Sequence, residues 1–551
     1  MNAKNKQQES QSPWRYWRGL GAWNIYFLFK FALLWFGYLN FHPLANLVFL
    51  AFLLFPIPAY RVHRWRHWIA IPIGIGLLYH DTWLPGINSI MSQGSQVTGF
   101  SFSYLIELFG RFINWAMIGA AFTILVGYLF ISQWIRVTVF VVAAMIWLNI
   151  AGIAGPAFSL APTVETAAAT AAPASTEQPA AGGSPVEAGG PPTDANLNAH
   201  LNVFYEQEKT RRTTFPASLP GDAQPFDLLV INICSLSWSD IEAIQLDKHP
   251  LWGKFDILFK NFNSATAYSG PASIRLLRAS CGQSSHKDLY QPQDQQCYLF
   301  DNLAKLGFTS QLVMDHSGVF GNYLQNIQDD GNMRAPMMSQ KGISNQLASF
   351  DGEPIYNDLE LLNRWLEQQK NGGDTRSATF MNIIPLHDGN RFVGTNKSAD
   401  YHARAQTLFD QLNTFLEELE KSGRKVMVVV VVPEHGAALV GDKMQMSGLR
   451  DIPSPSITHI PVGIKLIGMK APSPASPVVV SAPSSYLAIS ELVSRMVDGK
   501  VFTAPSVDWQ TLTQGLPETA VISENDNAIV MQYQGKPYIR LNGGDWVPYP
   551  Q

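Results

Sequence analysis

The first 160 residues contain a succession of long apolar runs, and these constrain the fold more than any other feature. Five runs approach the roughly 20 residues that an α-helix needs to cross a bilayer. They cover residues 23–39, 44–60, 68–84, 112–132 and 137–155. A signal peptide is the poorer alternative, because the first run is followed at once by others. We therefore predict a membrane domain over residues 1–159, with about five transmembrane helices.

Loop charges predict how these helices are oriented, because basic residues concentrate in cytoplasmic loops. Basic residues precede run one and lie between runs two and three and between runs four and five: Lys4, Lys6, Arg15, Arg18, Arg61, Arg64, Arg66 and Arg136. With the N-terminus in the cytoplasm, five spans then place everything after about residue 158 outside the cytoplasm. The third run is the weakest, since it contains Pro72 and ends at His80-Asp81. If that run were only re-entrant, the C-terminal half would be cytoplasmic.

Lys30 lies inside the first apolar run. A lysine there is costly unless it faces protein or water. It therefore marks either a contact with another helix or partner, or a side chain that snorkels to the membrane surface.

Residues 160–197 are expected to be a disordered linker. The segment 160–193 consists mainly of Ala, Pro, Gly, Thr and Ser, so it cannot bury a core. Residues 1–160 contain ten Lys and Arg against three acidic residues, which leaves 29 basic and 40 acidic residues for the remainder. This acidic balance gives no reason to expect a nucleic-acid partner.

Residues 198–551 are predicted to form an α/β domain. Apolar strands are expected at 226–233, 309–316, 378–387, 428–432 and 462–468. Helices with apolar stripes are expected at 401–423 and 484–499, and the tail is predicted to close with a hairpin. The alternation of strands and helices predicts a mostly parallel sheet covered by helices.

Chemically versatile residues stand where these strands end. Cys234 follows the first strand, His387 follows the 378–387 strand, and Glu434 and His435 follow the run of five valines. Ser269 precedes Gly270-Pro271 and an amphipathic run, which is an N-terminal helix signature. Ligands of α/β proteins bind at the carboxyl ends of strands. Taken singly, the serine is more simply an N-cap, the cysteine a buried apolar residue and the histidine a loop residue.

Together these residue types favour a metal-assisted transfer reaction. Cys, His and carboxylate side chains are zinc ligands, and a catalytic zinc keeps one position open. A serine hydroxyl needs a metal or a base to become a nucleophile. A transferring phosphoryl group also needs a second positive charge. Candidates for that charge are Arg450, His387 and Arg275, each of which is equally compatible with a solvated surface position.

The motifs resemble a known family. The stretches NICSLSWSDI, NFNSATAYSGPASIRLLRASCGQ, PLHDGN, VVPEHGAAL, SGLRDIPSPSIT and HDTWLPG look like those of the BcsG family of cellulose phosphoethanolamine transferases, within the alkaline-phosphatase-like superfamily. The resemblance covers nearly the whole chain except the Ala-Pro linker.

The resemblance implies a role for each candidate residue. Ser269 would be the nucleophile, and one zinc would be held by Cys234, Glu434, His435 and the Ser269 oxygen. Tyr268, His387 and Arg450 would line the pocket, and Cys281 and Cys297 would form a disulfide. A Cys replaces the superfamily's usual first-strand acid, and Glu-His replaces Asp-His. These departures leave a second metal open.

The implied reaction moves phosphoethanolamine from phosphatidylethanolamine to the 6-hydroxyl of glucose units in cellulose, through a phosphoethanolamine-serine intermediate. Subunits of the cellulose synthase complex are the expected partners. Two alternatives remain. One is a non-catalytic assembly subunit of that complex, and the other is a phosphodiesterase or sulfatase of the same fold.

Overall fold

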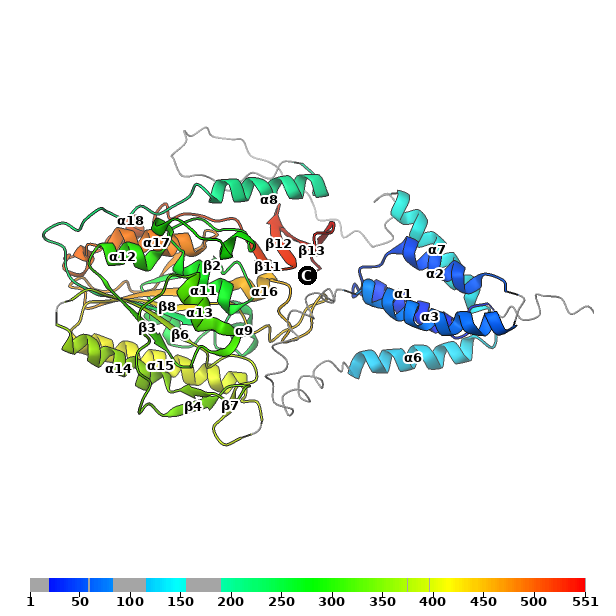
Figure 1. Ribbon diagram of the computed structural model, residues 1–551, viewed down its shortest axis with the longest axis horizontal. Helices are drawn as coiled ribbons and strands as arrows, with labels where there is room; N and C mark the ends of the chain where they lie inside the picture. The colour runs from blue at the N-terminus through cyan, green and yellow to red at the C-terminus, as the bar shows by residue number, and fades with distance from the viewer. Residues whose placement is uncertain are drawn as a thin grey trace, which may run out of the picture. The chain divides into compact units, whose positions relative to one another are not determined.

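The computed structural model describes residues 19–57, 60–82, 115–154, 190–373, 375–395 and 397–550. The chain divides into two compact units (Figure 1). One contains the described residues of Met1–Leu84 and Gly110–Pro179, and the other contains the described residues of Ala180–Tyr549. Residues 58–59, 83–84, 112–114 and 155 of the predicted spans, and 160–189 of the predicted linker, lie outside the described residues. The linker was predicted to end at residue 197, and helix α8 (Asp194–Glu208) begins within that range.

The N-terminal unit is helical, and a helix lies on each of the five predicted runs. The helices are α1 (Trp23–Trp35), α2 (Pro43–Leu54), α3 (Tyr60–His80), α6 (Trp115–Ile131) and α7 (Val137–Ala154). The core packs Phe27 of α1 against Phe49 and Leu53 of α2 and Met145 of α7. Within the part of the chain that the structure describes, no helix combines the length and apolar character that crossing a membrane requires.

The C-terminal unit is built on a seven-stranded mixed sheet with the strand order β10-β2-β9-β8-β1-β6-β3. These strands are β1 (Asp227–Ile233), β2 (Ile257–Asn263), β3 (Thr309–Met314), β6 (Ser377–Ile383), β8 (Val426–Pro433), β9 (His459–Ile467) and β10 (Val478–Val480). β8, β1, β6 and β3 are parallel, whereas β9 is antiparallel to both of its neighbours. The prediction of a mostly parallel sheet therefore needs one amendment, at β9.

Two helical layers cover this sheet. The helices are α9 (Trp238–Ala243), α10 (Leu251–Lys254), α11 (Ser269–Leu277), α12 (Leu299–Lys305), α13 (Tyr323–Asp329), α14 (Asp358–Asn371), α15 (Tyr401–Ser422), α16 (Pro455–Thr458), α17 (Tyr486–Met496) and α18 (Trp509–Thr513). α14 and α15 lie on one face, and α12 and α17 lie on the other (Figure 1). Strand β1 contributes side chains to the hydrophobic cores on both faces of the sheet. Leu228 and Val230 lie in one core, and Leu229 and Ile231 lie in the other.

The predicted closing hairpin is part of a four-stranded antiparallel sheet. Its strands are β11 (Ile522–Asn525), β12 (Ala528–Tyr533), β13 (Lys536–Leu541) and β14 (Trp546–Pro548). Helix α8 (Asp194–Glu208) packs on it through Leu197, Leu201 and Phe204. A third small sheet has the order β5-β4-β7 and comprises β4 (Asn345–Ala348), β5 (Pro354–Tyr356) and β7 (Arg391–Phe392).

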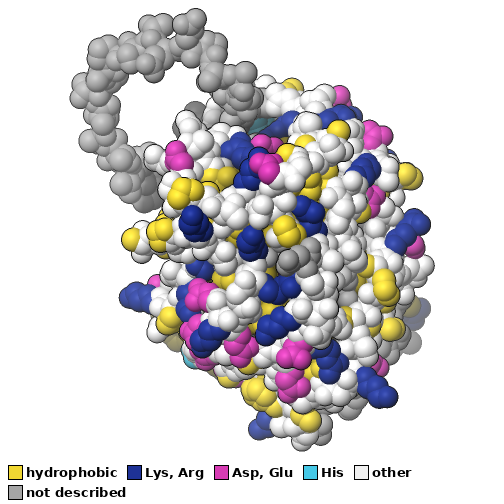
Figure 2. All heavy atoms as spheres, turned by 90° about the vertical axis from the view of Figure 1, so that its left-hand side faces the viewer, with side chains coloured by type: hydrophobic (Ala, Val, Ile, Leu, Met, Phe, Trp, Pro, Cys, Tyr) yellow, Lys and Arg dark blue, Asp and Glu magenta, His cyan; other side chains and the backbone are white. Residues whose placement is uncertain are grey.

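One face of the C-terminal unit is mixed in charge. On the face drawn in Figure 2, acidic and basic side chains are interspersed.

Candidate active site

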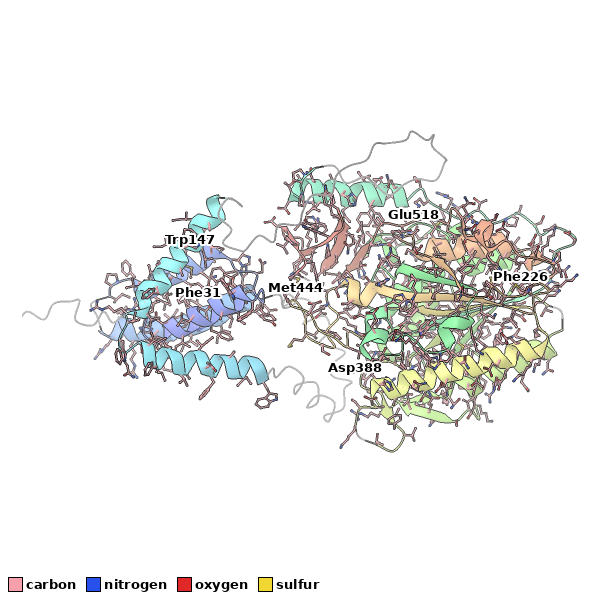
Figure 3. All side chains as sticks on the ribbon, turned by 180° about the vertical axis from the view of Figure 1, so that it is seen from behind. Phe31, Trp147, Phe226, Asp388, Met444 and Glu518 are labelled. Carbon is pink, nitrogen blue, oxygen red and sulfur yellow. A yellow bond between two sulfur atoms is a disulfide. The ribbon has the colours of Figure 1, made fainter. Side chains whose placement is uncertain are left out.

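The carboxyl ends of β1 and β8 lie side by side because the two strands are parallel neighbours. Cys234 directly follows β1, and Glu434 and His435 directly follow β8. Ser269 begins α11 next to them. Figure 3 shows Phe226, just before β1, at the opposite end of the sheet from Asp388 and Met444. The sheet therefore gathers the predicted reactive residues at one edge.

These four residues lie within contact distance of one another. Ser269 Oγ is 3.2 Å from His435 Nε2 and 3.4 Å from Cys234 Sγ. Cys234 Sγ is 4.0 Å from His435 Nε2, and Glu434 Oε2 is 3.9 Å from the same nitrogen. Potential ligand atoms of Cys234, Glu434 and His435 all lie within 4.8 Å of one another. The group is compact enough for its members to share one metal ion.

The end of β8 is shaped by a bulge and by a buried carboxylate. The register between β1 and β8 shifts between Val230 and Asn232, and Val431 has a left-handed backbone with φ 56°. Bulges next to active sites redirect the side chains that follow. Beyond the bulge, the buried Asp240 accepts hydrogen bonds from the backbone N–H groups of Ala437 (2.7 Å) and Leu439 (3.1 Å).

Gly436 makes this close approach possible. A Cβ atom there would lie only 2.6 Å from Ser237 Oγ and 2.8 Å from Asp240 Oδ2. A larger residue at this position would push the segment away from Asp240 and displace His435.

One carboxylate oxygen of Glu434 is fully engaged and the other is not. Oε1 accepts hydrogen bonds from Asn382 Nδ2 (2.7 Å), Ser273 Oγ (3.2 Å) and Tyr323 OH (3.5 Å). Oε2 is buried without a hydrogen-bond partner. A buried carboxylate oxygen without a partner is costly. The three donors fix the carboxylate and leave Oε2 facing Cys234 and His435, where it could act as a metal ligand.

The protonation states of Cys234 and His435 also suit a metal site. Burial, reinforced by the Glu434 carboxylate, raises the pKa of the Cys234 thiol to about 12. Burial and then the Arg450 guanidinium lower the pKa of His435 well below its usual value. His435 is therefore a neutral imidazole, and its Nδ1 lies 2.8 Å from the Gly436 carbonyl oxygen, so Nε2 can act as a ligand. Only a strong cation would deprotonate so buried a thiol.

The pocket-lining candidates have distinct positions. Arg450 NH1 lies 3.1 Å from His435 Nδ1 and donates to Ser235 Oγ at 3.2 Å. His387 stacks on Phe350, and burial followed by Arg450 lowers its pKa to about 4. The Tyr268 hydroxyl donates to Asp451 Oδ1 at 2.7 Å.

Two expectations from the sequence need correction. Ser269 is the first residue of α11 rather than its N-cap; Tyr268 holds the cap position, without a side-chain cap hydrogen bond. Arg275 does not join the site, because its NH1 donates to the Ser284 carbonyl oxygen at 2.6 Å. The α11 helix turns the Arg275 side chain toward the 284–290 loop, so Arg450 is the guanidinium beside His435.

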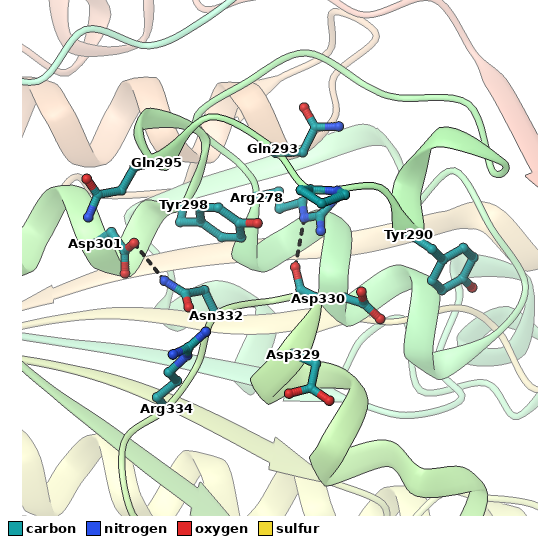
Figure 4. Close-up of a pocket in the computed structure, with 11 residues that line it drawn as sticks. Arg278, Tyr290, Gln293, Gln295, Tyr298, Asp301, Asp329, Asp330, Asn332 and Arg334 are labelled. Atoms are coloured by element: carbon teal, nitrogen blue, oxygen red, sulfur yellow. Dashed lines mark hydrogen bonds between the residues drawn. The ribbon is translucent and has the colours of Figure 1, made fainter.

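A disulfide and several hydrogen bonds stabilise the segment just beyond the C-terminal end of α11. Cys281 and Cys297 form a disulfide, the pairing that the resemblance implies. Arg278 donates to the backbone carbonyl oxygens of Leu289, Gln291 and Asp330. Beside this segment is a cavity of about 310 Å³, which Figure 4 shows lined by polar side chains that include Asp301 and Asn332. It lies at the end of α11 opposite Ser269.

Sequence reasoning missed the residues that hold the candidate ligands in place. Asn382 and Asn232 sit within apolar strands, and Tyr323 begins the short helix α13, so nothing local marks them. Asp240 had a visible signal, because Ser237 and Asp240 have the spacing of a capping box.

The fold and the site together define an α/β protein with a mixed seven-stranded sheet and a group of metal-ligand residue types where two parallel strands end. The family model for the cellulose biosynthesis protein BcsG C-terminal domain matches residues 182–546, and the model for the BcsG N-terminal domain matches residues 23–150. The chain therefore belongs to the BcsG family of cellulose biosynthesis proteins.

Relatives support this membership. The chain is 64% identical to cellulose biosynthesis protein BcsG of Salmonella typhimurium over 560 residues, covering 99% of this chain and 100% of the relative. It is also 64% identical to the Escherichia coli K12 protein of the same name over 548 residues, covering 98% of each.

Solved structures give more distant likenesses. An alkaline phosphatase superfamily protein from Vibrio parahaemolyticus is 13% identical, with a TM-score of 0.43 over 64% of this chain and 87% of that one. The C-terminal periplasmic domain of phosphoethanolamine transferase EptC from Campylobacter jejuni is 14% identical, with a TM-score of 0.37 over 55% of this chain and 99% of that one.

Proposed function

We propose that the chain is a zinc-dependent phosphoethanolamine transferase that moves the group from phosphatidylethanolamine to the 6-hydroxyl of glucose units in cellulose. The observation that carries this proposal is the group of Cys234, Glu434 and His435 around Ser269, with Glu434 Oε2 buried and unpartnered. Membership of a cellulose biosynthesis family supports the choice of acceptor.

The residues present suit a zinc ion. One thiol, one imidazole and one carboxylate are ligand types that zinc takes, and Ser269 Oγ lies beside them. Such an ion, when bound, supplies Lewis-acid stabilisation of negative charge on oxygen.

Side chains of this protein would carry out the nucleophilic attack and the proton transfers. Ser269 Oγ loses its proton and forms a bond to phosphorus, while the bond from phosphorus to the diacylglycerol oxygen breaks and that oxygen takes up a proton. In the second half-reaction the glucose 6-hydroxyl loses its proton and attacks phosphorus, and the Ser269 oxygen leaves and is protonated again. Neutral His387 has a lone pair for such a proton, since its pKa is about 4.

Charge on the phosphoryl oxygens needs fixed positive groups. Ser269 begins the nine-residue helix α11, whose first N–H groups and positive dipole end lie beside the reacting oxygen. The Arg450 guanidinium, next to His435, supplies a full charge.

The N-terminal unit fits a membrane anchor within this proposal. Its apolar helices would hold the chain in the bacterial inner membrane beside its lipid donor, with the catalytic unit in the periplasm and the Ala-Pro linker giving reach toward the polymer. Subunits of a cellulose synthase complex would be its partners.

Mass spectrometry of the full chain in detergent tests the proposal. After incubation with phosphatidylethanolamine, the peptide containing Ser269 should carry a phosphoethanolamine adduct, and Ser269→Ala should carry none. Ser269→Ala should fold normally, because the Ser269 side chain caps nothing. Ser285→Ala, which leaves the site intact, should keep the adduct.

Other outcomes would select an alternative. An adduct on Ser273 or Thr266 would refute the assignment of the nucleophile. Neither an adduct nor zinc would favour a non-catalytic assembly subunit, and preferential cleavage of sulfate esters would favour a sulfatase.

A further inference from the structure

The N-terminal unit contains a second cluster of metal-ligating side chains. His42 immediately precedes α2, His80 ends α3 and Asp81 follows it. Asp81 Oδ1 is 2.9 Å from His42 Nδ1 and 3.7 Å from His80 Nδ1. One potential ligand atom from each of these three residues lies within 4.8 Å of the other two. Two imidazoles therefore converge on one carboxylate oxygen.

The other carboxylate oxygen of Asp81, Oδ2, contacts Lys30 and Asn46. Lys30 Nζ lies 2.5 Å from Asp81 Oδ2, and Asn46 Nδ2 donates to the same oxygen at 2.6 Å. Lys30 Nζ also donates to Asn46 Oδ1 at 2.6 Å. All three residues are completely buried. Lys30 therefore neutralises Asp81 through Oδ2, while Oδ1 faces the imidazoles and also accepts a hydrogen bond from the His42 backbone N–H at 3.3 Å.

The cluster is accessible on the side of the histidines. The side chains of His42 and His80 are 40% and 61% exposed, whereas Asp81 is fully buried. The two rings lie 4.2 Å apart between centroids. A buried carboxylate, oriented by surrounding hydrogen bonds and flanked by open imidazoles, is the arrangement that second-shell groups create at metal sites.

From this geometry we infer that His42, His80 and Asp81 bind a divalent transition-metal ion, of which zinc is the natural choice. Bonds of 2.0–2.1 Å in a tetrahedral site keep ligands about 3.3 Å apart. The two distances to Asp81 Oδ1 lie on either side of that value. Lys30 and Asn46 serve as the outer partners of Asp81, and water completes the coordination.

The ion would cross-link the turn before α2 to the end of α3. One backbone hydrogen bond already joins these segments, from Asn40 N to the Asp81 carbonyl oxygen at 2.9 Å. This site is separate from Cys234, Glu434 and His435, because all of its residues belong to the N-terminal unit.

Metal analysis of the full chain in detergent tests the inference. After dialysis against zinc and then against buffer, the wild type should retain two zinc ions per chain. His80→Ala should retain one, and His80→Cys, which restores a ligand, should retain two. His67→Ala is the control from the same helix, because His67 instead accepts a hydrogen bond from Trp23 Nε1.

Cobalt distinguishes the two sites. A Cys234→Ser/His435→Ala variant loaded with Co²⁺ should show d–d absorption without thiolate charge transfer, and adding His80→Ala should abolish it. Absence of bound metal in the Cys234→Ser/His435→Ala variant would overturn the inference. One zinc in the wild type that His80→Ala removes would uphold it and would instead count against the proposed catalytic metal.

Discussion

Replacing Asn382 by leucine should weaken metal binding without touching a ligand. Asn382 Nδ2 donates the shortest of the three hydrogen bonds to Glu434 Oε1, at 2.7 Å. Leucine keeps the volume of the side chain but removes the donor. Glu434 would then keep only the bonds from Ser273 and Tyr323 and would sample positions in which Oε2 no longer faces Cys234 and His435.

The size of the effect follows from the bond that is lost. A hydrogen bond to a charged group contributes about 1.5–3 kcal/mol, and each 1.4 kcal/mol is a factor of about ten. We therefore expect zinc affinity to fall about 10- to 100-fold, the range typical for second-shell changes. Ser273→Ala at 3.2 Å should cost less, and Tyr323→Phe at 3.5 Å least.

Competition with a chromogenic chelator, performed on the full chain, measures these affinities. Thr379→Val is the matched control, because Thr379 is a buried polar residue of the same strand whose hydroxyl contacts Gln311 and Trp365. It should change stability alone. Unchanged zinc affinity in Asn382→Leu, or the reverse order among the three variants, would refute the argument that these donors aim Glu434.

Three further predictions concern stability and orientation. Cys281→Ser should lower the melting temperature and leave zinc bound, since the bridge closes a loop with a sequence separation of 16 and contributes about 3 kcal/mol in the chain-entropy model; a Cys234 bridge in peptide maps would contradict it. Burial lowers the pKa of His316 to about 3, so the unfolded chain alone binds this proton between pH 6.5 and 3. Because of this residue, the free energy of unfolding should decrease as the pH is lowered through this range, by up to about 1.4 kcal/mol per pH unit. His316→Phe should make the free energy of unfolding, measured by urea titration at several pH values, depend less steeply on pH; an unchanged pH dependence would refute the prediction. A phosphatase reporter fused near residue 200 should be active, and a silent one would indicate four spans.

The sequence predicted the elements that carry the candidate site because their signals are local. The valine run, the 226–233 strand and the 401–423 helix each have the apolar pattern of a buried element, and they appear as β8, β1 and α15. Parallel neighbours end at the same edge, so Cys234 and Glu434-His435 were expected to meet. The direction of β9 has no such signal, because an apolar strand has the same composition whichever way it runs.

The residues that orient the candidate ligands could not be predicted, because their roles arise only from tertiary contacts. Asn382 and Asn232 are polar interruptions in apolar strands, and in the structure Asn382 Nδ2 lies 3.1 Å from Asn232 Oδ1 while also donating to Glu434. Ser273 lies one turn after Ser269, and its hydroxyl reaches both Asn232 Oδ1 and Glu434 Oε1. Helix α11 therefore presents one serine to the reacting edge and a second serine to the carboxylate beneath it. A substitution at Ser273 should consequently act on zinc affinity before it acts on the chemistry of Ser269.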